Sequence, residues 1–170
     1  MQNRERLLAL KNRPTLDNIE SSLFALSLDP HTLESQPTSD PLIRPSLDAH
    51  VQNCASGHAG RNRWFDKALS IVIETDGRAG MMGEHSPCDA LIPSVIVDYV
   101  VAEPVDISRF DAQPSRTDGW KRLEWNVDEE LQTEIQQCEE RNWKIVEDSD
   151  ASQLWWSEYG ADWIKKIGEC

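Results

Sequence analysis

The first third of the chain carries apolar residues at helical spacing, interrupted by prolines. Residues 4–11 have the pattern of the end of a helix, which Pro14 stops. A second helix is predicted over residues 15–28, because the apolar residues there can share one broad face. A short helix is predicted at 47–52, and the segments around it are rich in turn-forming residues and predict loops at 31–45 and 54–60.

The middle of the chain predicts a β-hairpin. Residues 68–74 (ALSIVIE) are short, apolar and β-branched, which is typical of a strand buried on both faces. Residues 75–78 (TDGR) predict a turn in which Gly77 supplies the positive φ. Residues 79–83 would return as the second strand, so His85 is expected just beyond the end of the hairpin.

The segment after the hairpin changes from strand to helix spacing. Residues 90–101 (ALIPSVIVDYVV) are apolar nearly all round, which predicts a buried helix that tolerates Pro93 in its first turn. Residues 103–119 carry prolines, aspartates and serines, and predict a linker or a long surface connection.

The last third returns to recognisable elements. The alternation in residues 122–127 (RLEWNV) predicts a strand. Asp128 is expected to cap an amphipathic helix that runs to about Trp143. Residues 154–156 are a further candidate strand. The mixture of strands and helices predicts an α/β or α+β fold, and we adopt α/β.

Composition and charge narrow the range of partners. The 170 residues include 30 acidic and 17 basic side chains, for a net charge of −13. A chain this acidic repels nucleic acid and anionic lipid. No apolar run approaches the roughly 20 residues of a membrane-spanning helix. The four cysteines and four histidines are scattered, so we predict no metal site and expect reduced thiols.

The chemistry-bearing segment runs from Arg61 to Asp89 (RNRWFDKALSIVIETDGRAGMMGEHSPCD). It places a histidine at a strand end, preceded by Glu84 and followed four residues later by Asp89. An imidazole titrates near neutrality, so His85 could take a proton from a hydroxyl or thiol and return it later. Taken alone, this spacing also fits an ordinary surface or core histidine.

The same segment resembles the central region of the choline/carnitine O-acyltransferase family, and the variant after the histidine looks closest to fungal carnitine acetyltransferases. The resemblance is carried by an Asn-Arg-Trp-Phe-Asp-Lys run, a glycine-containing turn, a Glu-His-Ser triplet and an acid four residues after the histidine, here 62–67, 77–80, 84–86 and Asp89. The family implies a partial chloramphenicol acetyltransferase-like two-domain fold. Residues 1–122 would belong to its N-terminal domain and 123–170 would begin its C-terminal domain.

The resemblance implies a reaction and the residues that perform it. His85 would be the general base in reversible acyl transfer between acyl-CoA and carnitine, a reaction of fatty acid metabolism. Asp89 and Glu84 would support the site, with Asp89 at a position that pairs with a distant arginine. Lys165 and Lys166, in the segment WWSEYGADWIKK, would bind coenzyme A. Ala161 stands where the family usually has a further lysine.

The remaining expectations also follow from the family. Coenzyme A thioester is a substrate, so no cofactor is expected, and a full-length enzyme would be a monomer. Family motifs downstream of the histidine have no counterpart in these residues, so the chain alone is expected to be inactive. The alternative is a catalytically dead remnant that acts as a binding or interaction module. The cytoplasm is the expected compartment, with mitochondrion or peroxisome as alternatives.

Overall fold

The chain folds around one small sheet that carries helices on both sides. A computed structural model describes residues 2–32, 45–57, 60–109, 119–154 and 156–168. In chain order, the elements of these residues are α1 (Gln2–Ala9), α2 (Arg13–Ser21), β1 (Ala25–Leu28), α3 (Pro45–Ser56), β2 (Leu69–Ile73), β3 (Ala79–Gly83), α4 (Leu91–Ala102), the 3-10 helix η1 (Ile107–Arg109), α5 (Glu129–Glu147) and α6 (Ala161–Ile167).

The sheet has the strand order β1-β2-β3 and mixed polarity. β1 runs parallel to β2, with Ala25 opposite Ser70. β2 runs antiparallel to β3 through the predicted hairpin, with Leu69 opposite Gly83. The turn contains Gly77 at φ 86°, a conformation that a side chain would strain. The hairpin, its turn and the position of His85 just after β3 are therefore confirmed.

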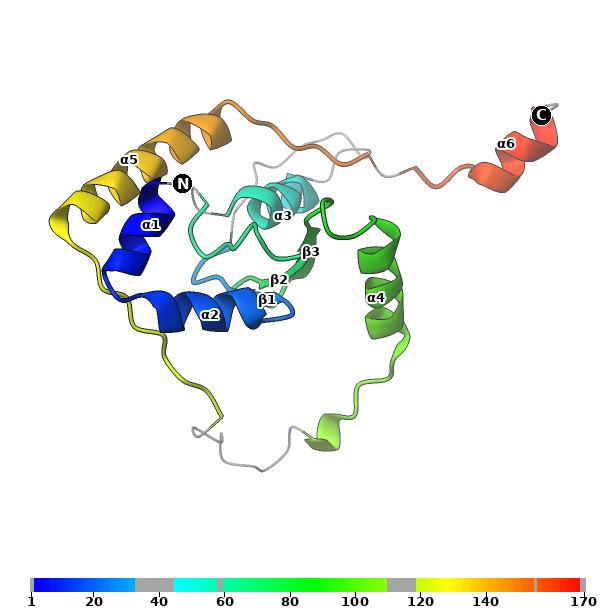
Figure 1. Ribbon diagram of the computed structural model, residues 1–170. Helices are drawn as coiled ribbons and strands as arrows, with labels where there is room; N and C mark the ends of the chain where they lie inside the picture. Colours follow the sequence, from blue (N-terminus) through cyan, green and yellow to red (C-terminus); the bar gives the residue numbers. More distant parts are fainter. Residues whose placement is uncertain (1, 33–44, 58–59, 110–118, 155, 169–170) are drawn as a thin grey trace.

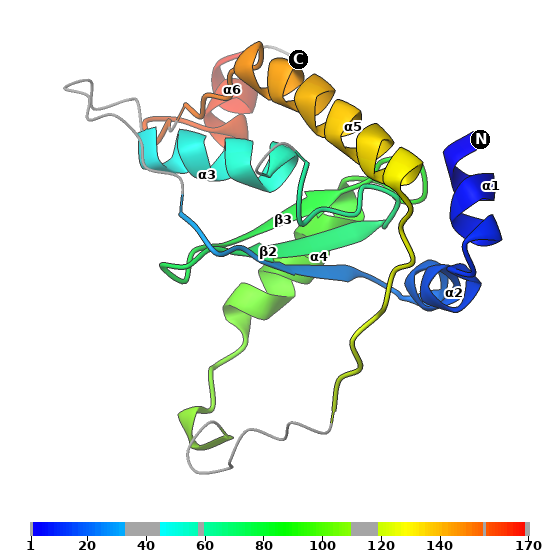
Figure 2. The same cartoon turned by 90° about the vertical axis from the view of Figure 1, so that its left-hand side faces the viewer.

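Only one face of the sheet is well covered. Figure 2 shows α3 over this face, with α4 on the opposite side. Beneath α3, Ser27, Ser70 and Val72 are buried. Gly80 comes so close to α3 that an added Cβ would lie 2.3 Å from Cys54 Sγ. The absence of a side chain at Gly80 thus lets the strand and the helix pack.

A buried ion pair joins the end of β1 to the segment that leads into β2. The Arg63 guanidinium donates two hydrogen bonds of 2.8 Å to the carboxylate of Asp29, one to each oxygen. Asn62 and Asn53 each donate a further bond of 2.9 Å to the same carboxylate. Burial raises the pKa of Asp29, but these bonds, that of Arg63 foremost, outweigh burial and lower it to about 2.

A second carboxylate continues this cluster beneath α3. Glu74 is 3% exposed and its Oε1 accepts a hydrogen bond of 2.9 Å from Asn53. His50 Nδ1 lies 2.7 Å from the same oxygen. Arg78 pairs with the other oxygen at 2.8 Å. The side chains of α3 therefore tie the turn end of the hairpin to the residue that follows β1 through polar contacts.

The N-terminal helices are held by a segment that precedes α5. Asn12, which is 1% exposed, donates to the carbonyl of Asn126 at 2.8 Å and accepts from its N–H at 2.7 Å. Thr15 Oγ1 donates to the carbonyl of Glu124 at 2.7 Å. These bonds connect the corner between α1 and α2 to residues that follow position 122. The domain boundary predicted at 122/123 stays a prediction.

The helix predicted over residues 15–28 is confirmed in its first half and wrong in its second half. α2 ends at Ser21, and 25–28 form β1 instead. Lys67 is buried and its Nζ donates to the carbonyls of Glu20 and Ser22, at 3.0 and 2.8 Å, which satisfies the end of the helix. The chain is then free to turn and pair with β2, a partner that local spacing does not reveal.

Three further sequence expectations need correction. Residues 122–127 are extended but form no strand, because side chains of the N-terminal helices take up the backbone groups of Glu124 and Asn126. In the candidate strand at 154–156, Leu154 forms an isolated bridge and Trp156 is not in a strand, while residue 155 lies outside the described residues. The predicted loop at 54–60 is replaced as far as Ser56 by α3, which contains the predicted helix at 47–52.

The apolar helix after the hairpin is confirmed as α4, but its predicted burial is wrong. None of its residues is buried, and Val95 and Tyr99 are 59% and 66% exposed. α5 is also confirmed, and the Asp128 side chain caps it by accepting from the Leu131 N–H at 2.9 Å. The predicted loop at 31–45 and linker at 103–119 lie largely outside the described residues. Within the described ranges, no helix is long and apolar enough to span a bilayer.

Candidate active site

His85 lies in the turn that joins β3 to α4. The N–H of Glu84 donates to the carbonyl of Ala68 at 3.1 Å, which extends the ladder between β2 and β3 by one pair. The thiol of Cys88 lies 3.7 Å from the same carbonyl and 3.6 Å from that of Glu84. The backbone before and after His85 is therefore fixed to the rigid hairpin.

The side chain of Glu84 shapes the turn around His85. Its Oε1 accepts hydrogen bonds from the hydroxyl of Ser86 at 2.6 Å and from the Ser86 N–H at 3.0 Å. These two bonds, the hydroxyl first, lower the pKa of Glu84, and the nearby imidazole of His85 adds to the effect. Ser86 thus holds Glu84 as a carboxylate beside His85.

The imidazole of His85 itself is exposed, and its interaction with Glu84 is electrostatic. No hydrogen bond or ion pair to another residue within the described ranges is formed by this side chain. A free imidazole on an anchored turn can accept a proton from an approaching hydroxyl or thiol. The geometry therefore permits the predicted role of general base.

Asp89 supports the start of α4. Its Oδ1 accepts from the N–H of Leu91 at 3.0 Å, and its carbonyl accepts from the N–H of Ile92 at 3.0 Å. In the described part of the chain, Asp89 forms no ion pair with an arginine. The carboxylate thus closes a tight turn just before α4. Its predicted pairing with a distant arginine stays a prediction.

A shallow hollow of about 170 Å³ opens beside the imidazole. It is lined by Gly83, Glu84, His85, Cys88, Ala90 and Pro93. Complete small-molecule sites typically enclose about 300–1,000 Å³. The hollow is therefore smaller than a complete small-molecule site.

Lys165 and Lys166 lie far from this hollow. They occupy the last turn of α6 and are exposed. In Figure 1, α6 stands at the end of an extended segment, well away from the turn between β3 and α4. The structure does not bring the two lysines and His85 together, and their predicted role in binding coenzyme A stays a prediction.

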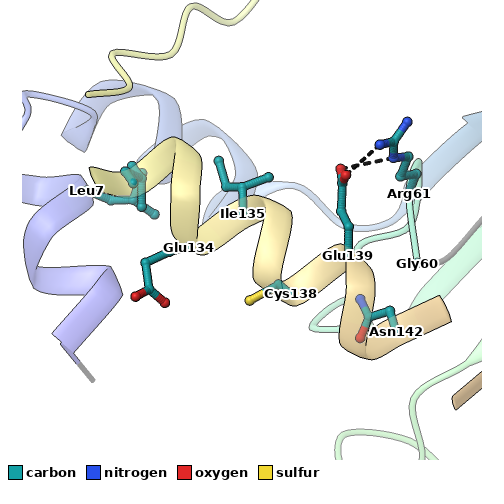
Figure 3. A pocket seen from close by; sticks show the side chains of 9 residues that line it. Leu7, Gly60, Arg61, Glu134, Ile135, Cys138, Glu139 and Asn142 are labelled. Carbon is teal, nitrogen blue, oxygen red and sulfur yellow. Dashed lines mark hydrogen bonds and ion pairs between the residues drawn. The ribbon is translucent and has the colours of Figure 1, made fainter. Parts of the chain in front are cut away.

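A larger groove of about 360 Å³ runs between α1 and α5 and contains none of the predicted site residues. Figure 3 shows Leu7 and Ile135 on its apolar side, with Arg61 paired to Glu139 at its rim through a bond of 2.9 Å from Nε. A guanidinium already neutralised by a carboxylate offers little to an anionic substrate. The chemistry of the smaller hollow at His85 therefore identifies the candidate site.

The buried cluster around Asp29 is a structural feature that local sequence analysis missed. Arg63 and Asn62 belong to the motif before the hairpin, but their partner Asp29 lies more than thirty residues earlier. The sequence signal that could have indicated a buried ion pair is the charged Arg63 close to an apolar strand. Among the described residues, no group of three or more His, Cys, Asp or Glu side chains could hold a metal ion.

The candidate site is an exposed histidine just after a hairpin, beside an acid and ahead of α4. A sequence model of the choline/carnitine o-acyltransferase family matches residues 1–169. The chain therefore belongs to the choline/carnitine O-acyltransferase family.

Individual relatives include enzymes for both substrates. Choline O-acetyltransferase of Danio rerio is 30% identical over 159 residues, which cover 91% of this chain and 24% of the relative. The human choline O-acetyltransferase is 29% identical over 91% of this chain and 20% of its own length. Carnitine O-acetyltransferase of Mus musculus is 26% identical over 157 residues, 91% of this chain and 24% of the relative.

These matches define the family more sharply than the substrate. The chain spans about a quarter of the length of the curated relatives it matches. Because choline and carnitine enzymes match over the same share of this chain, the preference for carnitine is not resolved. The comparisons show membership of the family and not the expected likeness to a fungal carnitine acetyltransferase. Of the expected two-domain fold, the structure shows an α/β arrangement with one small sheet.

Proposed function

We propose that this chain supplies the general base, His85, for reversible transfer of an acyl group between coenzyme A and carnitine. The observation that carries the proposal is the free imidazole on an anchored turn, at the rim of a hollow in a chain of this family. Choline is the competing acceptor, because choline acetyltransferases are among the relatives.

The proposed role of His85 in the reaction is proton transfer. His85 takes the proton of the carnitine hydroxyl as that oxygen attacks the thioester carbonyl. When the carbonyl re-forms, the carbon–sulfur bond breaks and the thiolate of coenzyme A takes the proton back from the imidazolium. The acyl group moves directly from sulfur to oxygen, and no acyl-enzyme is formed.

Charge at Glu84 fits this role. The carboxylate next to His85 stabilises an imidazolium during the transfer, and its hydrogen bonds to Ser86 keep it ionised. Lys165 and Lys166 are proposed to meet the phosphates of coenzyme A. This requires that the phosphates lie far from the reacting thioester, because α6 stands well away from His85 in Figure 1.

The experiment is acetyl-CoA turnover followed as release of free thiol, with L-carnitine or choline as acceptor. It compares the 170-residue chain with its His85→Ala variant. Carnitine-dependent release that the variant loses supports the base and the substrate, and a greater rate with choline overturns the preference for carnitine. Family motifs downstream of the histidine have no counterpart in these residues, so we expect the chain alone to fall short of a whole enzyme by a factor of about 100–1,000 or more.

A second function is favoured by a different observation. Many large apolar side chains are exposed, among them Leu28 at 64% and Val95 at 59%. An interaction module without catalysis would carry such surfaces. Equal, acceptor-independent thiol release by the parent chain and by His85→Ala would favour the module over the enzyme. For either function the cytoplasm is the proposed compartment, to be checked by fractionation.

A further inference from the structure

The residue after the candidate base is a serine that a proline follows. Ser86 lies in the turn between β3 and α4, and it is exposed together with its neighbours His85 and Pro87. Of the nine prolines in the chain, only Pro87 follows a serine or a threonine. Ser86 is therefore the single hydroxyl of this chain that stands directly before a proline.

Pro87 gives the hydroxyl two properties that an enzyme can recognise. A proline disfavours the helical conformation of the residue before it and favours an extended one. It also has no backbone N–H, so a groove that holds it need not supply an acceptor at that position. An exposed Ser-Pro dipeptide thus fits a protein kinase that phosphorylates serine ahead of proline.

The helix after the turn is loosely held, which makes the turn accessible. None of the residues of α4 is buried, and Val95 and Val100 are 59% and 63% exposed. α4 meets β3 where Pro93 approaches Gly83. Segments with few buried contacts open at a much lower free energy than the whole fold. The segment around Ser86 can therefore open into the groove of a kinase while the hairpin stays folded.

A phosphate on Ser86 would meet carboxylates on both sides. The hydroxyl donates to Glu84 Oε1 at 2.6 Å, and this bond is lost when the oxygen carries a phosphate. Asp89 already accepts a hydrogen bond of 3.0 Å from a backbone N–H at the start of α4. From residue 79 to residue 108 the sequence has no lysine or arginine. The imidazole of His85 is therefore the one side chain of this segment that can supply a positive charge.

The phosphate would stabilise that positive charge. A phosphoserine carries about −1.5 to −2 charges at pH 7. A nearby opposite charge favours the charged form of an ionisable group, which for His85 is the imidazolium. An imidazolium has no lone pair with which to accept a proton from a hydroxyl or thiol. A phosphate at Ser86 thus acts on the chemistry of the neighbouring base.

We propose that Ser86 is the acceptor of a proline-directed protein kinase, and that its phosphate keeps His85 protonated and so prevents His85 from acting as a base. In the modification, Ser86 Oγ bonds to the γ-phosphorus of a nucleoside triphosphate. The bond from that phosphorus to the diphosphate oxygen breaks, and the hydroxyl proton passes to a base of the kinase. The loss of acyl transfer rests on the proposed function, whereas the phosphorylation and the protonation of His85 do not.

The first measurement is phosphate incorporation into the 170-residue chain. The chain is incubated with a proline-directed serine kinase, Mg²⁺ and ATP, and the site is located by mass spectrometry. We expect one phosphate, at Ser86, and none in Ser86→Ala. Pro87→Ala should slow incorporation about tenfold or more, because the kinase loses the contact that selects the site. Pro104→Ala, at an exposed proline beyond α4, is the matched control and should leave the rate unchanged.

The second measurement follows the turn in the phosphorylated chain. Nitrogen-15 NMR at pH 7 should show a larger protonated fraction of the His85 ring than in the unmodified chain, with His31 as the internal control. Hydrogen exchange at the Ser86 amide should quicken about tenfold or more, because its bond of 3.0 Å to Glu84 is lost. The amide of Glu74, which is bonded at the turn end of the hairpin, should not change.

Three results would overturn the proposal. The first is a synthetic peptide of residues 80–92 that the kinase does not phosphorylate. The second is a chain that stays unmodified while this peptide is phosphorylated. The third is a phosphorylated chain in which the protonated fraction of His85 is unchanged. Because that fraction is measured without substrate, a larger protonated fraction supports the proposal even where the chain releases no thiol and the proposed function fails.

Discussion

Replacing Asp29 by asparagine tests whether the buried ion pair holds β1 to the hairpin. Asp29 and Arg63 are 6% and 8% exposed, and two bonds of 2.8 Å join them. Asparagine keeps the shape of the side chain but leaves the guanidinium buried without a counter-charge. Removing one partner of such a pair costs about 3–5 kcal/mol, out of the roughly 5–15 kcal/mol that keeps a typical domain folded.

The same carboxylate has a signature in acid. The pKa of Asp29 falls from 3.8 to about 2 on folding, and such a shift corresponds to about 2 kcal/mol. Because the folded value lies below the unfolded value, this stabilisation is present above about pH 4 and is lost as the pH falls through the folded pKa of about 2. Asp29→Asn should remove this part of the pH dependence.

Urea unfolding, followed by tryptophan fluorescence and circular dichroism at several pH values, measures both effects. The matched control is Arg13→Ala, which removes the exposed pair with Asp17 and should cost no more than about 1 kcal/mol. The reasoning fails if Asp29→Asn is no more destabilising than Arg13→Ala. It also fails if the variant keeps the parent's loss of stability between pH 4 and pH 2.

Three further substitutions test other parts of the structure. Gly80→Ala should cost about 1–3 kcal/mol, because the new Cβ would clash with Cys54 Sγ at 2.3 Å; Gly119→Ala, with open space around it, is the control in the same urea titration. Asn12→Ala should cost about 1–3 kcal/mol, because the backbone of Asn126 loses its buried partners, and thermal unfolding that leaves the midpoint unchanged would contradict this. His85→Ala should leave the unfolding free energy within about 0.5 kcal/mol of the parent, since the side chain is exposed and makes no bond within the described residues; a larger loss would give the imidazole a structural role.

Local signals were sufficient for the hairpin and for α5. Residues 69–73 combine β-branched side chains with a glycine turn at Gly77, and Asp128 precedes an amphipathic run, so short-range chemistry alone specifies these elements. The candidate site also follows from local information. His85 lies beyond the strand end because the length of β3 is set by its pairing across the turn.

The failures share one physical cause, which is dependence on distant residues. Residues 25–28 have helical spacing but form β1, since pairing with β2 and the Lys67 cap outweigh local propensity. Residues 122–127 alternate like a strand, yet no strand of the described residues pairs with them. α4 is apolar all round, and whether such a helix is buried depends on what packs against it.

The sequence by itself therefore determined the hairpin, the capped helix α5, the family motif and the position of His85 beyond β3, because each is encoded within a few neighbouring residues. Only the tertiary structure decided that Asp29 meets Arg63, that α4 has no buried residue, and that Lys165 lies far from His85. Contacts between residues tens of positions apart depend on how the whole chain closes on itself, which short-range periodicity does not encode.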